Sequence, residues 1–578
     1  MNTAMECILY LAVLILLAVP LGTYIGKVMN GEPVFLSKVI LPIENATYRM
    51  LKIEKEEQMT AKKYSISVIL FSVFSFLVLF LLHLLQGVLP LNPESLPGTS
   101  WHLAFNNTSS FVTNTNWQSY SGESTLSYFT QMLGLTVQNF ASAAVGIAVL
   151  FALIRGFIKV KETGLGSFWV DTTRTILYIL LPLSLVISIA LVSQGVIQNF
   201  SSYQTVTLVQ PVTLQDGTKI TQEVVPQGPA ASQIAIKQLG TNGGGYMGTN
   251  SAHPLENPTP FSNLIEMLSI LLIPAALCFT FGRNVKDKRQ GVAIFLAMFI
   301  LLCSALAVIA ASESGASPQL AQNGAVNVSS VGQAGGNMEG KETRFGIAAS
   351  STWAAFTTAA SNGSVNSMHD SYTPLGGMIP MLLMQLGEVV FGGVGCGLYG
   401  MIGFAILAVF IAGLMVGRTP EYLGKKIEPY EMRMAVLVCL ATPVAILIGS
   451  GLAAALPQTV QSLSNKGAHG FSEILYAYSS AGGNNGSAFA GFNANTVFGN
   501  VSIGLIMLFV RFVPMLATLA IAGSLVQKKR VAVSAGTLPT HNAMFVGLLI
   551  FVVLLIGALS FFPALALGPI AEYFQMLG

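Results

Sequence analysis

Charged residues are scarce in this chain. Lys, Arg, Asp and Glu make up only 9% of its 578 residues, whereas a soluble domain carries about 25%. The net charge of +3 gives no support to a protein that binds nucleic acid. Hydrophobic residues make up 53% of the chain, and many apolar runs exceed the ~20 residues that cross a bilayer. The shortage of charge therefore excludes an ordinary soluble domain and indicates an integral membrane protein with helical spans.

Sequence signals for nucleotide and metal chemistry are also missing. The five cysteines are scattered and no CxxC occurs, so neither a disulfide framework nor a metal site is indicated. The six histidines show no paired spacing of the kind that metal ligands have. No GxxxxGK[ST] string occurs, and the GxGxxG match at 395–400 lacks the strand-and-helix context of a dinucleotide site. We therefore predict that the chain is not an enzyme by itself and cannot hydrolyse ATP alone.

Ten membrane spans are predicted from the apolar runs. The first run lacks a basic n-region and a cleavage site, so we interpret it as a retained helix. Five alternate loops hold 22 of the 28 Lys and Arg residues. Because basic loops stay on the cytoplasmic side, the other loops and both termini are predicted on the outer side. The spans are expected at about 5–28, 64–89, 131–158, 172–196, 259–284, 290–312, 376–417, 430–455, 497–526 and 541–567.

Four short polar strings recur at nearly equal spacing on the predicted outer side. Each follows a moderately apolar stretch of 10–15 residues, which is too short to span and suits a re-entrant pore helix. These stretches are 101–112, 230–239, 346–360 and 471–480. One Asn-Gly alone would simply be a turn, but four copies in register indicate a ring around an ion. The strings are Thr113–Gln118, Thr241–Gly245, Ser361–Ser364 and Asn484–Ser487.

The residue types in the strings suit a dehydrated cation. Backbone carbonyls can replace its water, glycine permits the φ values that aim successive carbonyls at one axis, and Asn, Thr and Ser brace the loop. Carboxylates are sparse there, which argues against a calcium-type ring. The predicted filter residues are Thr113, Asn114, Thr115, Asn116, Gln118, Thr241, Asn242, Gly243, Gly244, Ser361, Asn362, Gly363, Asn484, Asn485 and Gly486.

The first string lacks glycine, so its alignment with the others is ambiguous. Either Asn114-Thr115 or Asn116-Trp117 could match Asn242-Gly243 of the second string. The predicted ring is therefore asymmetric, with one Asn/Gln-based quadrant and three Asn-Gly-based quadrants.

Two charged residues lie within predicted spans. Glu388 belongs to the run 376–417, which is about twice the length a bilayer needs and is interrupted by Gly392–Gly397. This pattern predicts a broken helix, a feature that marks transport pathways. Arg511 lies in the middle of another span, where a charge is usually paired or lines a pathway. We predict that the two residues are partners, either as a gate or coupling element below the filter or as a pair that only locks two helices.

The fold class predicted from these patterns is an all-α polytopic membrane protein with ten transmembrane helices. Four membrane-pore-membrane repeats would surround a pseudo-fourfold axis, with one extra helix at each end. No function is assigned to the outer loop 197–228. The units are 1–60 (extra helix and cytoplasmic loop), 61–165, 166–286, 287–424 (with the broken inner helix), 425–532 and 533–578 (extra helix).

Several segments closely resemble one known family along essentially the whole chain. The segments Val112–Tyr120, Gly240–Gly245, Met368–Ser371 and Gly417–Glu428 resemble the potassium-binding A subunit of the bacterial Kdp potassium-transporting ATPase. The resemblance implies membership of the potassium transporter superfamily and a place in the bacterial inner membrane. It also implies a complex with a P-type ATPase catalytic subunit, which binds ATP and magnesium, and with two small membrane subunits.

The resemblance further implies roles for particular residues. Gln118 matches a position linked to selectivity, and Glu388 and Arg511 match residues thought to act below the filter. Arg418 matches a conspicuous loop arginine to which we assign no role. The bound ion implied is potassium, with no other cofactor on this chain. The matching filter glycines are Gly243, Gly363 and Gly486.

Two other classes of function are alternatives to the prediction that the chain is a subunit of an ATP-driven potassium importer. One is a stand-alone potassium channel or ion-coupled carrier with the same fourfold plan, which would move potassium without a partner or ATP. The other is a polytopic membrane enzyme, which would need His or carboxylate ligands clustered at one membrane depth. The sequence shows no such cluster, so the importer subunit is the leading prediction.

Overall fold

Ten helices in the computed structural model are long and apolar enough to cross a membrane. The structure describes residues 3–214, 216–315, 335–415, 417, 420–532 and 537–577, so Arg418 lies outside the described residues. The predicted number and order of spans are confirmed within the described chain. They are α1 (Thr3–Met29), α3 with η1 (Ala61–Leu85, Gln86–Val88), η2 with α6 (Thr130–Thr136, Val137–Ile158), α7 with η3 and α8 (Phe168–Arg174, Thr175–Leu180, Leu181–Ser193), α10 (Pro260–Asn284), α11 (Lys288–Ser314), α15 (Cys396–Met415), α16 (Pro429–Ala455), α19 (Val497–Gln527), and α20 with η7 and α21 (Ala543–Leu565, Ala566–Ile570, Ala571–Leu577).

Local side-chain chemistry fixes where several spans begin. Thr259 and Ser262 form a capping box at the start of α10, and Thr496 accepts a hydrogen bond from the Gly499 N–H at the start of α19. Asn542 caps α20 in the same way. Such caps satisfy N–H groups that the first turn of a helix leaves without partners.

Burial separates central spans from peripheral ones. In the most apolar part of α6, 89% of the residues are buried, against 22% in α1 and 28% in α3. The large apolar side chains that remain exposed on the peripheral helices, such as Leu16, Phe74 and Leu185, suit contact with lipid. The protein core is therefore built around α6 and its neighbours.

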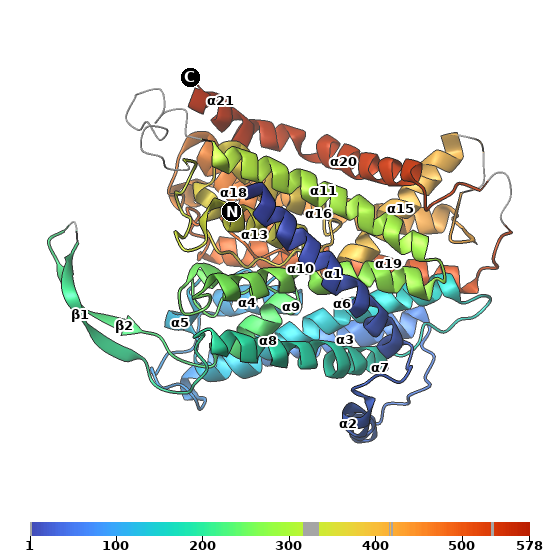
Figure 1. Ribbon diagram of the computed structural model, residues 1–578, viewed down its shortest axis with the longest axis horizontal. Coiled ribbons are helices and arrows are strands. Elements are labelled where there is room, and N and C mark those ends of the chain that lie inside the picture. Colours follow the sequence, from blue (N-terminus) through green and yellow to red (C-terminus); the bar gives the residue numbers. More distant parts are fainter. Residues whose placement is uncertain are drawn as a thin grey trace.

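Four short buried helices lie between the spans, as predicted. They are α4 (Trp101–Val112), α9 (Ala230–Leu239), α13 (Gly346–Ala359) and α18 (Gly467–Gly482). Each packs on the two membrane helices that flank it in sequence, and each also contacts a helix of the neighbouring repeat, for example α4 with α19 and α18 with α14. Each pore helix therefore bridges two neighbouring repeats. Both chain ends lie toward the pore-helix side of the molecule (Figure 1).

The predicted break in the run 376–417 is present. Helix α14 (Pro374–Gln385) ends before residue 386 and α15 begins at Cys396. Between them the backbone takes positive φ values at Gly387, Phe391, Gly392 and Gly395. Glu388 therefore lies in a non-helical segment at membrane depth, where irregular backbone is tolerated only if it is buried in protein or lines a cavity.

One element outside the spans is not predicted by the sequence. The loop 197–228 contains an antiparallel hairpin, β1 (Gln204–Thr213) and β2 (Lys219–Val225), which projects from the body at the left of Figure 1. Helix α2 (Ser37–Leu51) lies at the opposite side, where Glu44 pairs with Arg174. The remaining short elements are α5 (Gly122–Thr125), η4 (Asn250–Ala252), η6 (His369–Ser371), β3 (Glu421–Tyr422), β4 (Lys425–Lys426) and α17 (Pro457–Gln461).

Candidate functional site

Each polar string leaves the C-terminal end of a pore helix through the same backbone turn. In the second string Thr241 and Gly243 have φ values of 49° and 80°. Between them, Asn242 donates its N–H to the carbonyl of Lys237 at 2.8 Å. Positive φ is uncommon for residues with side chains, so its repetition marks a shared structure. The same pair of positive φ values recurs at Asn114 and Asn116, at Ser361 and Gly363, and at Asn484 and Gly486.

The first string has a register that differs from both predicted alignments. Its residue between the two positive-φ positions is Thr115, whose N–H donates to the Ser110 carbonyl at 2.9 Å, as that of Asn242 does in the second string. Thr115-Asn116 therefore matches Asn242-Gly243, and the predictions that paired residue 114 or residue 116 with Asn242 are wrong by one position. Asn116 takes the glycine position because asparagine tolerates the left-handed backbone better than most residues.

Neighbouring strings lie so close together that their glycines have no room for a Cβ atom. A Cβ on Gly243 would lie 1.8 Å from the carbonyl oxygen of Asn362 in the third string. The same contact recurs at 2.2 Å between Gly363 and the Asn485 oxygen, and at 2.2 Å between Gly486 and the Thr115 oxygen. Carbonyl oxygens of three strings therefore lie directly against the backbone of the next string.

Amide side chains join the four strings into a closed ring. Their donors reach across to a neighbouring string or pore helix, and together they connect the first string to the second, the second to the third, the third to the fourth and the fourth to the first. These bonds run from Asn114 Nδ2 to Thr241 O (2.9 Å), from Asn362 Nδ2 to Lys237 O (3.1 Å), from Asn485 Nδ2 to Thr357 O (2.7 Å) and from Asn484 Nδ2 to Thr115 Oγ1 (2.8 Å).

A buried ion pair supports the second string from behind. Lys237 Nζ contacts the Glu256 carboxylate, and both side chains are fully buried. The same Nζ donates to Asn250 Oδ1 at 2.7 Å, and Asn250 Nδ2 donates to the Gly243 carbonyl at 2.7 Å. The sequence does not predict this brace, because Lys237 lies between two predicted spans, outside the five basic loops. A lysine inside an otherwise apolar pore-helix stretch was the signal that could have revealed it.

Gln118 holds the first string against the second. Its Oε1 accepts from the Gly245 N–H at 2.9 Å, and its Nε2 donates to the hydroxyl of Tyr120 at 3.0 Å. Gln118 also lines a cavity of about 670 Å³ that opens beside Asn116, Gly363 and Gly486. We call this space the string-side cavity.

The string-side cavity carries little positive charge near the ring. Burial, followed by the nearby Lys341, lowers the pKa of His369 to about 3, so this lining residue is neutral. Lys341 is itself paired with the buried carboxylate of Glu313 at 2.7 Å, and burial lowers the pKa of Lys341. A cation in the cavity therefore meets neutral or neutralised groups.

The segment between α14 and α15 lies against the ring on the side away from the string-side cavity. The Val394 N–H donates to Thr241 Oγ1 at 2.9 Å, and the Gly392 N–H donates to the Ala359 carbonyl at 2.9 Å. These bonds tie the segment to the second string and to the end of the third pore helix. It therefore forms a floor under two quadrants, those of the second and third strings.

Glu388 and Arg511 are partners, as predicted. Arg511 Nη1 lies 3.5 Å from Glu388 Oε1, and the two side chains are 2% and 15% exposed. Among the described residues neither Nη1 nor Nη2 of Arg511 has a hydrogen-bond partner, so this is a long ion pair without a well-formed hydrogen bond. A cavity of about 30 Å³ beside Glu388, between α15, α16 and α19, has room for a water molecule.

The fold and the ring together define a class of membrane protein, one in which four pore helices and their polar strings surround a single axis within one chain. The structure of the potassium transporter TrkH from Vibrio parahaemolyticus shares this fold. It matches 86% of this chain and 96% of its own length with a TM-score of 0.50, at 13% sequence identity. At that identity the likeness concerns the fold alone.

The chain belongs to the family of potassium-transporting ATPase A subunits. The model of that family matches residues 8–574. A potassium-transporting ATPase potassium-binding subunit from Clostridium botulinum (strain Alaska E43 / Type E3) is 76% identical over 578 residues, covering 100% of both chains. Subunits of the same description from Desulfovibrio desulfuricans and Listeria welshimeri are 64% and 58% identical. The matches cover 100% and 99% of this chain, and 99% and 98% of those relatives. The resemblance found in the sequence is confirmed.

Proposed function

We propose that the ring of four strings binds potassium and selects it, and that the chain is the potassium-binding subunit of an ATP-driven uptake complex. The observation that carries this proposal is the closed ring itself, with its strings joined by side-chain amides at the ends of four buried pore helices. The printed descriptions of the relatives, each a potassium-binding subunit of a potassium-transporting ATPase, support the same function.

The chemistry of the ring suits a monovalent cation. Helix C-terminal ends carry partial negative charge, and all four pore helices direct that end toward the strings. None of the four strings contains Asp or Glu, whereas divalent cations are usually held by carboxylates. We infer that potassium ligands come from the predicted filter residues, now aligned so that Thr115 stands with Asn242, Asn362 and Asn485.

We further propose that Glu388 and Arg511 act as a gate or coupling element beneath the ring. A potassium ion that passes the ring would compete with the Arg511 guanidinium for the Glu388 carboxylate. The distance of 3.5 Å between the two charged groups supports a weak ion pair in which potassium can replace Arg511. Placing an arginine in the middle of a membrane span costs at least about 2.5–3.5 kcal/mol. A helix that only spans the membrane would not need such a residue.

The partners and the orientation are also proposals. We infer a P-type ATPase catalytic subunit, which binds ATP and magnesium, and two small membrane subunits, with the complex in the bacterial inner membrane. The basic loops would face the cytoplasm, and the strings and both termini would face outward. The distribution of 22 of the 28 Lys and Arg residues in alternate loops supports this orientation. We also propose that the four repeats are residues 61–165, 166–286, 287–424 and 425–532.

The experiment compares potassium binding to the purified complex carrying Gly243→Ala with that of the wild type. The new Cβ would overlap the Asn362 carbonyl and sit at φ 80°, so we expect potassium affinity to fall more than tenfold, or about 1.4 kcal/mol. Gly547→Ala is the matched control, because no atom lies within 4 Å of a Cβ built there. Unchanged affinity for Gly243→Ala would reject the ring as the filter. Robust potassium flux through the chain alone, without partners or ATP, would favour a stand-alone channel or carrier.

A further inference from the structure

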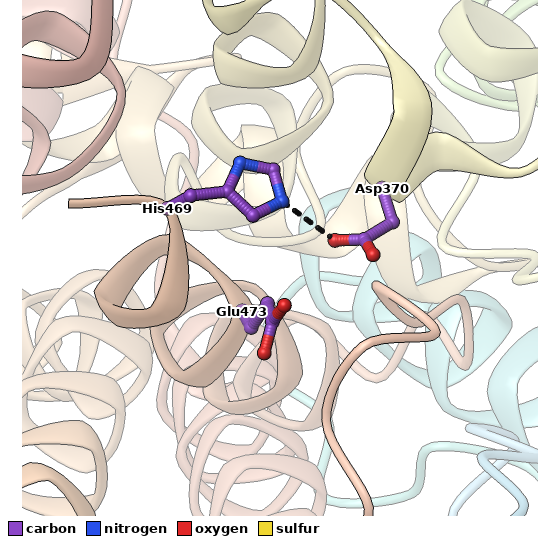
Figure 2. A group of neighbouring side chains, drawn as sticks. All are labelled: Asp370, His469 and Glu473. Atoms are coloured by element: carbon purple, nitrogen blue, oxygen red, sulfur yellow. Dashed lines mark hydrogen bonds and ion pairs between the residues drawn. The ribbon is translucent and has the colours of Figure 1, made fainter. Parts of the chain in front are cut away.

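A cluster of possible metal ligands lies apart from the ring. Asp370 in η6 and His469 and Glu473 in α18 each offer one ligand atom, and these atoms all lie within 4.8 Å of one another. In Figure 2 the His469 ring points at the Asp370 carboxylate, and the Glu473 carboxylate lies next to both. His469 Nε2 is 3.1 Å from Asp370 Oδ1.

The spacing along α18 explains how two of these ligands meet. His469 and Glu473 are four residues apart, so they project from the same face of the helix, one turn from each other. Asp370 comes from the loop that follows the third string, 99 positions away from His469 in the chain. The sequence does not predict this cluster, because its third ligand, Asp370, meets the His–Glu pair only in the folded chain.

Glu473 contributes a buried carboxylate to the cluster. The residue is fully buried. Its Oε1 accepts a hydrogen bond from Asn465 Nδ2 at 2.8 Å, but its Oε2 has no hydrogen-bond partner among the described residues. No ion pair of the described chain includes this carboxylate. His469, the basic residue of the cluster, is bonded to Asp370 and Glu572 instead. A buried carboxylate without an ion pair of its own is costly, and a metal ion between the three residues would supply positive charge.

The residues around the cluster orient it as protein metal sites are oriented. Glu572 of α21 lies 2.7 Å from His469 Nδ1, which turns Nε2 toward Asp370. Metal-binding histidines commonly give their second nitrogen to a carboxylate in this way. The Gly491 N–H donates to Asp370 Oδ2 at 3.2 Å. A Cβ on Gly491 would lie 2.1 Å from Glu473 Oε1 and 2.9 Å from Asp370 Oδ2, so only glycine leaves the ligand atoms uncovered.

We propose that Asp370, His469 and Glu473 bind a zinc ion, with Glu572 positioning the histidine. One imidazole nitrogen and two carboxylate oxygens suit Zn²⁺ as three protein ligands, with water as the fourth. Calcium, in contrast, takes six to eight oxygen ligands, and imidazole favours transition metals over hard cations. The ion would join the loop after the third string, the first turns of the fourth pore helix and the C-terminal helix α21. This site does not depend on the proposed role of the ring.

The test is a titration of the full-length chain, purified in detergent, with Zn²⁺ alone, followed by calorimetry and by measurement of the bound metal. We expect one zinc ion per wild-type chain and no detectable binding by Glu473→Gln or His469→Ala. Glu572→Gln should weaken zinc binding by about ten- to hundredfold, as loss of such a supporting carboxylate does elsewhere. His541→Ala is the control, because this exposed residue lies in a different pocket, and it should bind zinc like the wild type.

Folding of the variants is checked by gel filtration and by thermal unfolding without zinc. Glu572 is partly exposed, so its variant reports on the site even if a change at the buried Glu473 prevents folding. A wild-type chain that takes up no zinc would overturn the proposal. So would zinc binding of wild-type strength in both Glu572→Gln and His469→Ala, because the metal would then lie elsewhere.

Discussion

At the scale of single residues, the ring is held by neutral amides. Asn114, Asn362 and Asn485 each donate to a carbonyl of a neighbouring string or pore helix. An amide fixes the backbone without adding a formal charge, so the geometry of the strings can be rigid while their charge density stays low. Lys237 and Glu256, a pair of full charges close to the second string, are fully buried behind it.

Removing the brace behind the second string should weaken potassium binding. In Asn250→Ala the Gly243 carbonyl and the buried Lys237 both lose a partner, and an unsatisfied buried group costs about 1–3 kcal/mol. We expect potassium affinity of the complex to fall about tenfold, measured by equilibrium binding. Asn92→Ala is the control, since the side chain of Asn92 bonds to its sequence neighbours Gln86 and Leu96. Equal affinity in both variants would mean that the brace does not position the filter.

The register of the first string can be tested at Asn116. A glycine there keeps the φ of 53° and loses the bond from Asn116 Nδ2 to Asn139 Oδ1 at 2.6 Å. A valine is strained at that φ because its Cβ is branched. We expect Asn116→Gly to bind potassium within a few-fold of the wild type and Asn116→Val to lose binding. If the valine variant bound normally, Asn116 would not occupy the glycine position.

At the scale of elements, the interrupted helix brings a charge to the floor of the ring. Three glycines and Phe391 with positive φ allow the chain to cross from α14 to α15 without helical hydrogen bonds. Two backbone N–H groups of the segment donate hydrogen bonds to Thr241 Oγ1 and to the Ala359 carbonyl. These buried groups outside the helices are therefore still satisfied.

Arg511→Ala should affect transport more than potassium binding. The change leaves Glu388 without its ion-pair partner below the ring but does not touch the strings. We expect ATP-driven potassium uptake by vesicles with the reconstituted complex to fall more than tenfold, while equilibrium potassium affinity changes only a few-fold. Arg433→Ala, at an exposed position on α16, should leave both unchanged. Normal uptake by an assembled Arg511→Ala complex would show that the ion pair only holds two helices together.

The elements were predicted well where length and hydrophobicity decide the structure. The bounds of α4 and α9 match the predicted stretches 101–112 and 230–239, because a short apolar segment between polar ends has few other options. The hairpin β1–β2 was not predicted, although its strands flank Asp216-Gly217, a typical turn pair. Its strands are largely exposed, so no burial pattern indicated them.

The site was predicted less completely than the fold. The strings and the pairing of Glu388 with Arg511 followed from their positions in the chain. The register of the first string did not, because asparagine can replace glycine at positive φ and the sequence alone does not reveal the backbone angle. The Lys237–Asn250–Gly243 brace also depends on contacts that form only when the loop after the string folds back.

At the scale of the whole molecule, the proposed orientation can be tested by chemical labelling. Four of the native cysteines are buried and Cys303 is half-buried, so reaction of the native thiols should be slow. With Asp216→Cys in the hairpin and Lys55→Cys in the first basic loop, both exposed, a membrane-impermeant maleimide added to intact cells should label only the first. Labelling of residue 55 alone would show that the chain has the opposite orientation.

One polypeptide supplies all four quadrants of the ring, and this has a consequence for how the ring can vary. In a ring of four identical chains, a single codon change alters every quadrant at once. Here each string is encoded separately, so a substitution reaches one quarter of the ring and leaves the other three intact. Affinity can therefore change in small, independent steps, and Asn116 at a glycine position of the first string is an instance of such a local difference.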